Sequence, residues 1–510
     1  MPDSLIRLGE VELRFNPTTG KRLPFVAQAL SPTGGGNVLY VDGAADAEKA
    51  AQLLFDLVGP DANVESNPAI SAVIELIRTA IHEQYSLAQV LRRGIAFHYG
   101  NIPLIVRNEI ENCFKEGHIK HLICTSTLIE GVNLPCRSIF MRGPKKGRAR
   151  PMNESDFWNL AGRADRWGKE FQGNIVCVDA TDTNVWRLGT PRVRSQYRIE
   201  RTTDRILQEP EAIVQFINNR MPAQESASRP ELEFMGSYLV ASHLRFGSVA
   251  NTPFASRLDS RLLNQLETGL SSLISSFAIN GHVVLRNPGI SPVSMDNLLR
   301  YFTARDGSVE ELVPVPPTST DAVSNYIRVL ARINRELAPV FGVHKRIVML
   351  AMLVTNWMRG YPLKRLIAGR LDYERGRGQA VNASSTIRGV MKDVEEFARF
   401  QVPKYLSCYI DVLKQYLRSV DRGDLITADL DINILLEFGV PGGTQLSLMG
   451  LGLSRTSALA LAEYIANDQL SEEGCLAWLR ENDWRSLNLP ILVKREIDNA
   501  VELAVGSRAA

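Results

Sequence analysis

Apolar residues in the first 190 positions form short continuous runs that alternate with longer amphipathic stretches. The short runs are rich in branched and aromatic side chains, which is typical of strands buried on both faces; they are VLYV (38–41), IAFH (95–98), LIC (122–124), SIFM (138–141) and IVCV (175–178). Between them, apolar positions recur at helical spacing in residues 46–58, 70–93, 104–116 and 155–167. This alternation predicts an α/β domain in which helices cover both faces of a mostly parallel sheet.

The residues on either side of this domain follow other patterns. EVELRFNPTTGKRL (10–23) predicts a β-hairpin with Pro-Thr-Thr-Gly as its turn. Beyond residue 190 amphipathic helices dominate, and we interpret the short run HVVL (282–285) as a strand of a winged-helix-like module. PVPPTST (314–320) predicts a linker, and helices are expected near 321–337, 344–358, 362–374, 382–400 and 404–420.

The composition indicates an ordinary globular protein of 510 residues, of which 45% are hydrophobic and 22% charged. The 58 basic and 56 acidic residues nearly balance, so nucleic-acid binding would have to come from local basic patches. The N-terminus lacks a signal-peptide pattern, and no apolar run approaches the roughly 20 residues that span a bilayer. We expect a cytoplasmic protein with reduced, packed cysteines, since no CxxC pair occurs; they are Cys113, Cys124, Cys136, Cys177, Cys408 and Cys475.

Two common kinds of catalytic site find no support in the sequence. His118 and His121 are three residues apart, but no cysteine or carboxylate is placed to complete a zinc site, so no metal site is expected. Hydrolysis by a Ser/His/Asp triad is not indicated either, because no serine stands in a glycine-flanked elbow.

Hydroxyl side chains follow the predicted buried strand LIC. Thr125 and Ser126 stand at its carboxyl end, and in open α/β sheets ligands bind outside those ends. Hydroxyls and backbone amides at this place suit phosphate oxygens. Gly131 and Asn133 follow in GVNLP, as a flexible turn and an amide able to bind a ribose or phosphate. Threonine is also common in strands and helix caps, so only the ordered series with the next stretch favours a binding site.

That next stretch, NLAGRADRWG, places a glycine and two arginines in an otherwise helical pattern that Ser155 could cap. Asn159, Arg163 and Arg166 lie four and three residues apart and would share one helix face. Gly162 in a helix interior costs about 1 kcal/mol relative to alanine, a loss usually tolerated where another backbone or a ligand comes close. Taken alone, this stretch is also compatible with a helix face on which a solvated arginine pair lies beside a glycine that serves packing.

In this order the two stretches resemble motifs V and VI of superfamily-two DExH-box helicases, in the Ski-like branch that includes DNA-repair and RNA-surveillance motors. The narrower resemblance is to the helicase subunit of bacterial antiphage systems such as Hachiman. AFHYGNIP (96–103) resembles the AFHHAGLP signature of the same branch, and VLYVD (38–42) resembles the strand that opens its second RecA-like domain. The resemblance spans about residues 37 to 180 and is architectural beyond them.

The resemblance implies roles for these residues. Arg163 and Arg166 would be the motif VI arginines, which stabilise the charge that develops on the γ-phosphate by presenting fixed cationic forks. Asn159 stands where the family has glutamine and Asp165 where it has glycine, which weakens the implied nucleotide contact and backbone packing. The implied ATP-binding residues are Gly131, Asn133, Asn159 and Gly162, and the implied nucleic-acid-binding residues include Gly100, Thr125 and Ser126.

Cations gather in the connection between these two motifs, and they are Arg142, Lys145, Lys146, Arg148 and Arg150. A charge run is often a solvated loop, but this one is placed to contact phosphates. In related motors a hairpin here splits duplexes. Because this connection has only about a dozen residues, we interpret it as a phosphate-contacting loop and leave a wedge function open.

Near the C-terminus, QLSLMGLGLSRTSALALAEYI (445–465) resembles a helix-hairpin-helix. In such a unit the backbone amides at the start of the second helix bind a phosphate without reading sequence. Gly452 and Arg455 are the implied nucleic-acid-binding residues. The alternative is a plain helical hairpin that packs against its neighbours.

Two motifs of a complete motor are missing from the sequence. A phosphate-cradling GxxxxGK[ST] and a DExH carboxylate for magnesium are absent, and Gly34-Gly35-Gly36 lacks the lysine. We therefore expect the C-terminal part of an ATP-dependent helicase or translocase, with a 3′-to-5′ direction implied by the family. ATP and Mg²⁺ would be held mainly by a first RecA-like domain elsewhere, so this chain alone would be inactive. The alternative is a non-enzymatic nucleic-acid-binding or scaffolding subunit, which Asn159 and Asp165 favour.

The predicted fold class is α/β, with one RecA-like parallel-sheet domain followed by mostly α-helical domains. The expected parts are a hairpin and linker (1–36), the second RecA-like domain (37–190), a winged-helix-like module (191–315), a helical bundle (316–425) and a helix-hairpin-helix-like unit (426–510). The expected partners are single-stranded or tailed DNA in preference to RNA, the first RecA-like domain, and a nuclease or effector subunit. No membrane is expected among them.

Overall fold

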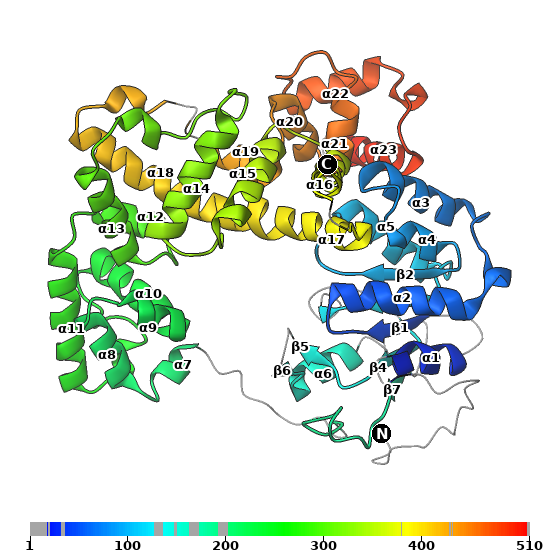
Figure 1. Cartoon of the computed structure of the whole chain (residues 1–510), viewed down its shortest axis with the longest axis horizontal. Helices are drawn as coiled ribbons and strands as arrows, with labels where there is room; N and C mark the ends of the chain where they lie inside the picture. The colour runs from blue at the N-terminus through cyan, green and yellow to red at the C-terminus, as the bar shows by residue number, and fades with distance from the viewer. Residues whose placement is uncertain are drawn as a thin grey trace. The chain divides into compact units, whose positions relative to one another are not determined.

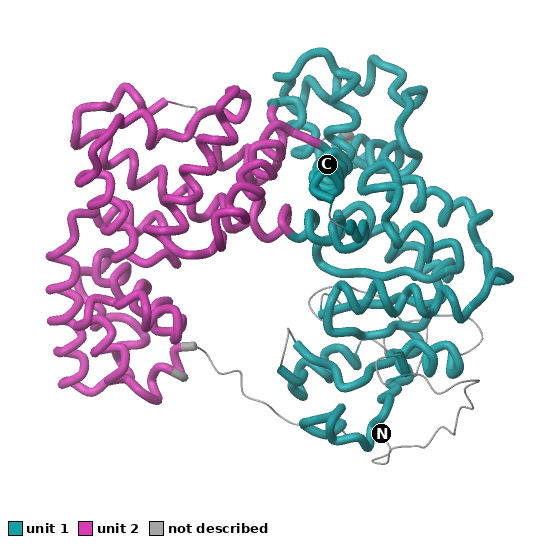
Figure 2. The backbone as a smooth tube through the Cα atoms, viewed as in Figure 1, with its two compact units in different colours: residues 1–197, 362–392, 442–510 teal, residues 198–361, 393–441 magenta. Residues whose placement is uncertain are grey.

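The computed structural model of the chain (Figure 1) describes residues 18, 21–31, 36–126, 136–146, 150–162, 173–191, 202–378, 380–427, 430 and 432–506. The chain divides into two compact units, which Figure 2 colours separately. Unit 1 comprises residues 1–197, 362–392 and 442–510, and unit 2 comprises residues 198–361 and 393–441.

A five-stranded parallel sheet forms the core of unit 1, with strand order β2-β3-β1-β4-β7. The strands are β1 (Asn37–Tyr40), β2 (Ile95–His98), β3 (His121–Cys124), β4 (Ser138–Met141) and β7 (Asn174–Cys177). The first four strands are buried along their whole length, whereas β7 is partly exposed. All five strands predicted from the apolar runs are present within one residue of their predicted bounds, and the α/β fold class is confirmed.

Helices from distant parts of the chain join this sheet in unit 1. The helices that accompany the strands are α1 (Arg22–Ala29), α2 (Ala44–Val58), α3 (Pro68–Ala80), α4 (Ser86–Leu91), α5 (Leu104–Lys115) and α6 (Glu154–Ala161). Those from later in the chain are α16 (Leu363–Gly376), α17 (Ala383–Asp393), α20 (Gly443–Gly450), α21 (Arg455–Ala462), α22 (Glu472–Glu481) and α23 (Ile491–Gly506). Ion pairs join the two groups, since Lys364 Nζ lies 3.1 Å from Glu83 and a guanidinium nitrogen of Arg495 lies 3.5 Å from Glu109.

Two local predictions in the N-terminal part are wrong. The single helix expected over 70–93 is two helices, α3 and α4, because Ile81 and Tyr85 between them both turn into the core. The hairpin expected over 10–23 is contradicted at its end, where α1 begins at Arg22 and buries Leu23 and Phe25. Residues 10–17, 19 and 20 lie outside the described part of the chain.

The described residues of unit 2 form helices and no strand. The helices are α7 (Thr202–Ile206), α8 (Pro210–Asn218), α9 (Ala223–Ser228), α10 (Pro230–Phe246), α11 (Ser260–Ser275), α12 (Gly281–Arg286), α13 (Pro292–Ala304), α14 (Ala322–Glu336), α15 (His344–Met358), a π-helix (Val394–Gln401), α18 (Val402–Ser419) and α19 (Asn433–Phe438). The predicted strand HVVL lies in α12. The Asn280 side chain caps this helix by accepting from the N–H of His282 at 2.8 Å, so the cap outweighs the β-branched residues.

The predicted linker PVPPTST is packed inside unit 2. Prolines supply no N–H, and helix side chains bind the carbonyls of this segment instead. Asn325 donates to the Val313 carbonyl at 2.9 Å, Tyr326 to that of Val315 at 3.2 Å, and Arg359 to that of Pro317 at 2.7 Å. The segment therefore packs against α14 and the C-terminal end of α15 instead of separating two domains. The expected part 316–425 contributes to both units.

Candidate nucleotide and nucleic-acid site

The carboxyl ends of the five parallel strands share one edge of the sheet. This edge gathers predicted residues that are far apart in sequence: Gly100 follows β2, Thr125 and Ser126 follow β3, and Arg142 follows β4. Thr125 is buried and Ser126 half-buried. Gly131 and Asn133, which continue the β3 segment, lie outside the described residues.

Arg142 is held in an ion pair at this edge. Its Nε donates to Asp179 Oδ2 at 2.7 Å, and Asp179 also accepts from Arg22 at 3.1 Å. The Arg142 side chain is only 17% exposed. The next residue, Gly143, has φ +50°, and a Cβ there would lie 2.3 Å from the Val185 carbonyl oxygen. The ion pair with Asp179 and the close backbone approach at Gly143 therefore give Arg142 a structural role beside its predicted phosphate contact.

The connection that follows is a short antiparallel ribbon of β5 (Lys145–Lys146) and β6 (Arg150–Pro151). It is anchored to the end of β1, because the Tyr40 hydroxyl donates to the Lys145 carbonyl at 2.8 Å and the Lys145 N–H donates to Asp42 at 2.8 Å. The sequence predicted a loop here, and the described residues form a hairpin base instead. Its tip, with Arg148, lies outside the described residues.

Acidic side chains accompany the cations of this ribbon. Lys145 Nζ lies 3.8 Å from Asp42, and Lys146 Nζ lies 3.1 Å from Asp156. Burial raises the pKa of Asp42, and its contacts with Lys145 oppose that shift. Arg150 is exposed. A bound phosphate would therefore compete with carboxylates for the two lysines.

The helix predicted over 155–167 corresponds to α6, which begins at Glu154, and residues 163–167 of the predicted span lie outside the described residues. Asn153, rather than Ser155, is its cap, and accepts from the N–H of Asp156 at 2.7 Å. Gly162 ends the helix as its C-cap instead of lying in its interior, where the glycine would be costly. Asn159 is exposed on α6. Arg163, Asp165 and Arg166 lie outside the described residues.

An aromatic cluster orients α6 toward the segment that follows β7. Phe157 is buried, and its ring packs edge-on against Trp158 and Trp186, with centroids 5.3 and 6.4 Å away. The Trp186 indole donates to the Val178 carbonyl at 2.9 Å. These contacts fix α6 against the segment that follows β7.

The two helices and the turn predicted over residues 445–465 are present as α20, a turn at Gly452 (φ +98°) and α21, an arrangement shared by a helix-hairpin-helix and by a plain helical hairpin. Ser454 caps α21. Glu496 of α23 accepts from the Ser454 N–H at 3.2 Å and from its hydroxyl at 2.8 Å. A carboxylate is stabilised at the N-terminus of a helix. The Glu496 carboxylate therefore contacts the start of α21, next to Arg455, where the sequence predicts a bound phosphate.

Residues 51–168 match the family model described as the helicase conserved C-terminal domain. Over these residues the sheet domain of unit 1 is similar to helicase C-terminal domains. This match includes β2, β3, β4, the ribbon and α6, and so covers the edge at which the predicted site residues gather.

Individual relatives agree with this assignment over a limited length. The chain is 35% identical over 121 residues to the antiviral helicase SKI2 of Saccharomyces cerevisiae, covering 22% of this chain and 9% of that protein. It is 29% identical over 112 residues to anti-bacteriophage protein B of Escherichia coli, covering 22% and 15%. It is 27% identical over 182 residues to the ATP-dependent DNA helicase Hel308 of Thermoplasma acidophilum, covering 36% and 24%. The chain thus matches a quarter or less of the length of each of these relatives.

Unit 1 also contains a buried polar network that the sequence pattern did not reveal. Glu48 of α2 is 8% exposed and forms an ion pair with Arg388 of α17. The Tyr99 hydroxyl donates to Glu48 at 2.9 Å and lies 2.6 Å from the Tyr85 hydroxyl. A glutamate among the alanines on the apolar face of α2 was the available signal, but nothing in the sequence indicated its partner 340 residues away.

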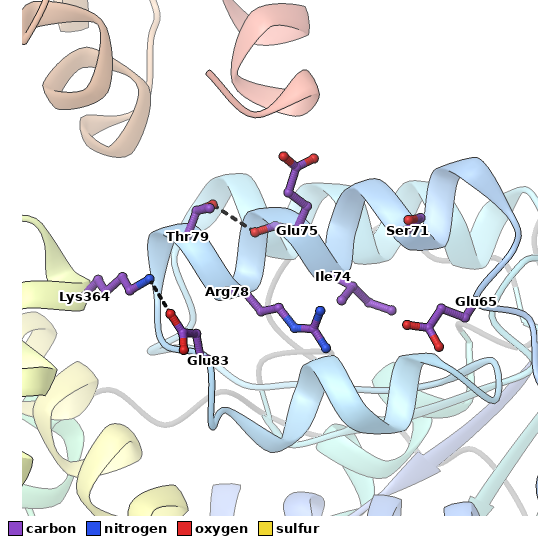
Figure 3. Close-up of a pocket in the computed structure, with 8 residues that line it drawn as sticks. All are labelled: Glu65, Ser71, Ile74, Glu75, Arg78, Thr79, Glu83 and Lys364. Carbon is purple, nitrogen blue, oxygen red and sulfur yellow. Dashed lines mark hydrogen bonds and ion pairs between the residues drawn. The ribbon is translucent and has the colours of Figure 1, made fainter. Parts of the chain in front are cut away.

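A polar cavity of about 620 Å³ opens beside α3 in the same unit (Figure 3). Its lining includes Glu65, Glu75, Glu83, Arg78 and Lys364, and none of the predicted site residues. Among the described residues, no group of histidine, cysteine and carboxylate side chains could hold a metal ion, although His118 does pair with Glu116 at 3.2 Å. No described helix is long and apolar enough to cross a membrane.

Proposed function

We propose that this chain supplies the second motor lobe of an ATP-dependent nucleic-acid helicase or translocase that moves 3′ to 5′. One observation carries the proposal. Gly100, Thr125, Ser126 and the β5–β6 ribbon gather at one edge of the parallel sheet, within the residues that match the helicase C-terminal domain model. Backbone N–H groups, hydroxyls and cations are the groups that bind phosphates without reading sequence. This edge of the sheet therefore suits a nucleic-acid strand that is held by its phosphate backbone.

ATP hydrolysis in this proposal needs a second lobe. A first RecA-like domain with GxxxxGK[ST] and DExH would hold ATP and Mg²⁺, and Arg163 and Arg166 would act on the γ-phosphate from this chain. The supports are the order of the motifs in the sequence and the aromatic base that orients α6. Gly131, Asn133, Asn159 and Gly162 would complete the nucleotide contacts.

The relatives suggest the partners. One is named a DNA helicase, and two others are named for antiviral or antiphage action. We therefore propose single-stranded or tailed DNA in preference to RNA as the strand, and a nuclease or effector subunit as a further partner. A role in antiviral defence is itself part of the proposal.

The test is strand-stimulated ATPase after a purified first RecA-like lobe is added to this chain. Wild type should restore turnover, and Arg166→Ala should lower it by about a thousandfold or more, as the loss of an arginine finger does. Arg257→Ala, which removes an exposed arginine of unit 2, should behave as wild type. No restoration, or full restoration by Arg166→Ala, would contradict the motor function.

The same assay separates the alternative, a non-enzymatic nucleic-acid-binding or scaffolding subunit. Asn159 and Asp165, which depart from the family pattern, favour that alternative. It predicts that the chain binds a strand but never restores turnover with any first lobe.

A further inference from the structure

The turn after β2 presents two backbone donors at the sheet edge. Tyr99 and Ile102 are buried at its two ends, and the Ile102 N–H closes it by donating to the Tyr99 carbonyl at 3.2 Å. Gly100 and Asn101 between them are half-buried. Within the described part of the chain, neither the Gly100 N–H nor the Asn101 N–H donates to another residue. Two adjacent backbone donors are therefore available to a phosphate oxygen.

The position of this turn depends on Tyr99. Its ring stacks on Phe97 with a centroid distance of 5.8 Å and an interplanar angle of 4°, and Tyr85 packs edge-on against Phe97 at 5.6 Å. Stacking limits motion of the Tyr99 ring perpendicular to its plane but leaves motion parallel to that plane. The hydroxyl contacts with Glu48 and Tyr85 remove that remaining freedom.

Glu48 can hold Tyr99 only if its own charge is compensated. A buried carboxylate without a partner is strongly disfavoured, and Arg388 supplies the partner from α17. Burial raises the pKa of Glu48, while Arg388 and Tyr99 act against that shift. The guanidinium therefore acts on the turn through two intermediates, Glu48 and the Tyr99 hydroxyl.

We propose that Arg388, Glu48 and Tyr99 form a positioning network that holds the Gly100 and Asn101 N–H groups against a strand phosphate. This inference rests on the proposed strand binding and adds a residue from α17 to the site. Arg388 is a positioning residue, since it orients the N–H donors and does not itself contact the phosphate. The side chain of Arg388 is 22% exposed, so a direct contact with phosphate is the competing explanation.

Salt dependence separates these two explanations. Each cation that contacts a phosphate of a single strand contributes about 0.7 to the slope of log affinity against log salt. A positioning residue contributes nothing to that slope. The assay is anisotropy of a fluorescein-labelled oligothymidylate of about 20 nucleotides with the full chain, over about 50 to 200 mM salt.

The variants are Tyr99→Phe, which keeps the ring, and Arg388→Lys, which keeps the charge but loses the planar fork. Each should weaken binding about three- to tenfold with the wild-type slope, which is the effect of losing about one ordinary hydrogen bond. The double variant should be no weaker than the stronger single variant, because both act through Glu48. Arg370→Lys is the matched control, since Arg370 pairs with Glu374 on α16 outside the network.

Three results would overturn the network. They are a slope reduced by about 0.7 in a further variant, Arg388→Gln, which removes the cation that Arg388→Lys keeps; unchanged affinity in both Tyr99→Phe and Arg388→Lys; or a loss of affinity that follows a lowered melting temperature and appears equally in Arg370→Lys. Failure of wild type to bind the oligonucleotide would overturn the proposed strand binding as well. Normal wild-type binding with unaffected variants would overturn the network alone.

Discussion

Removing the cations of the β5–β6 ribbon should flatten the salt dependence of strand binding. The perturbation is the fourfold substitution of Lys145, Lys146, Arg148 and Arg150 by alanine. If all four contact phosphates, the slope of log affinity against log salt should fall by about 2.8, at about 0.7 for each contact on a single strand. This figure is the upper bound.

The structure reduces the expected change. Lys145 and Lys146 lie near Asp42 and Asp156, and a lysine that keeps its carboxylate partner releases no counterion from the strand. If both pairs persist in the complex, only the two arginines count and the slope should fall by about 1.4. Asp156→Asn in an otherwise wild-type chain should then strengthen binding, because it frees Lys146 for phosphate.

The assay is anisotropy of a labelled oligothymidylate at several salt concentrations. The control variant removes four exposed arginines elsewhere in unit 1, namely Arg375, Arg480, Arg485 and Arg495. Exposed ion pairs contribute roughly 0 to 1 kcal/mol each, so both variants should remain folded. A slope equal to that of wild type in the ribbon variant, or an equal decrease in the control, would refute phosphate contact by the ribbon.

Three further predictions concern the scaffold and the C-terminal hairpin. Gly143→Ala should lower the free energy of unfolding by about 3 kcal/mol or more in urea titrations, against about 1 to 2 for Gly189→Ala, which also has positive φ but open space. His121 is buried with its pKa lowered to about 4, so protonation favours the unfolded chain; stability should fall by about 2 kcal/mol between pH 7 and 5, and His121→Val should remove that dependence. Glu496→Gln should strengthen oligonucleotide binding if the start of α21 binds phosphate; unchanged affinity would leave α20 and α21 as a plain hairpin.

Local pattern was sufficient to predict the sheet domain. IAFH is bounded by Gly94 and by the turn at Gly100, and β2 has the predicted bounds. HVVL has the same kind of composition and is helical. The difference lies in the surroundings of the two runs. Asn280 offers a cap and Gly281 starts a helix before HVVL, whereas β2 pairs with β3 along its whole length. Short β-branched runs adopt the structure that their surroundings favour.

Part of the candidate site was also predictable. Parallel strands bring their carboxyl ends to one edge of the sheet. The strand positions predicted from the sequence are therefore enough to place Gly100, Thr125 and Arg142 at the same edge. The carboxylates that accompany the cations could not be predicted in this way. Asp179 lies 37 residues beyond Arg142, and its φ of +54° and contact with Arg22 arise only in the folded chain. Charge at a binding edge depends on partners as much as on the cations themselves.

These pairings change what strand affinity can depend on. With a net charge of +2 and with Arg142, Lys145 and Lys146 each near a carboxylate, long-range attraction to a strand is weak. Backbone donors such as those of the turn after β2 carry no net charge and act only at hydrogen-bonding distance. Their contribution depends on being held in place before the strand arrives, since ordering them on binding would cost conformational entropy. A binding edge with compensated cations therefore relies on buried positioning groups, and Glu48 with its arginine partner is the buried charge beside that turn.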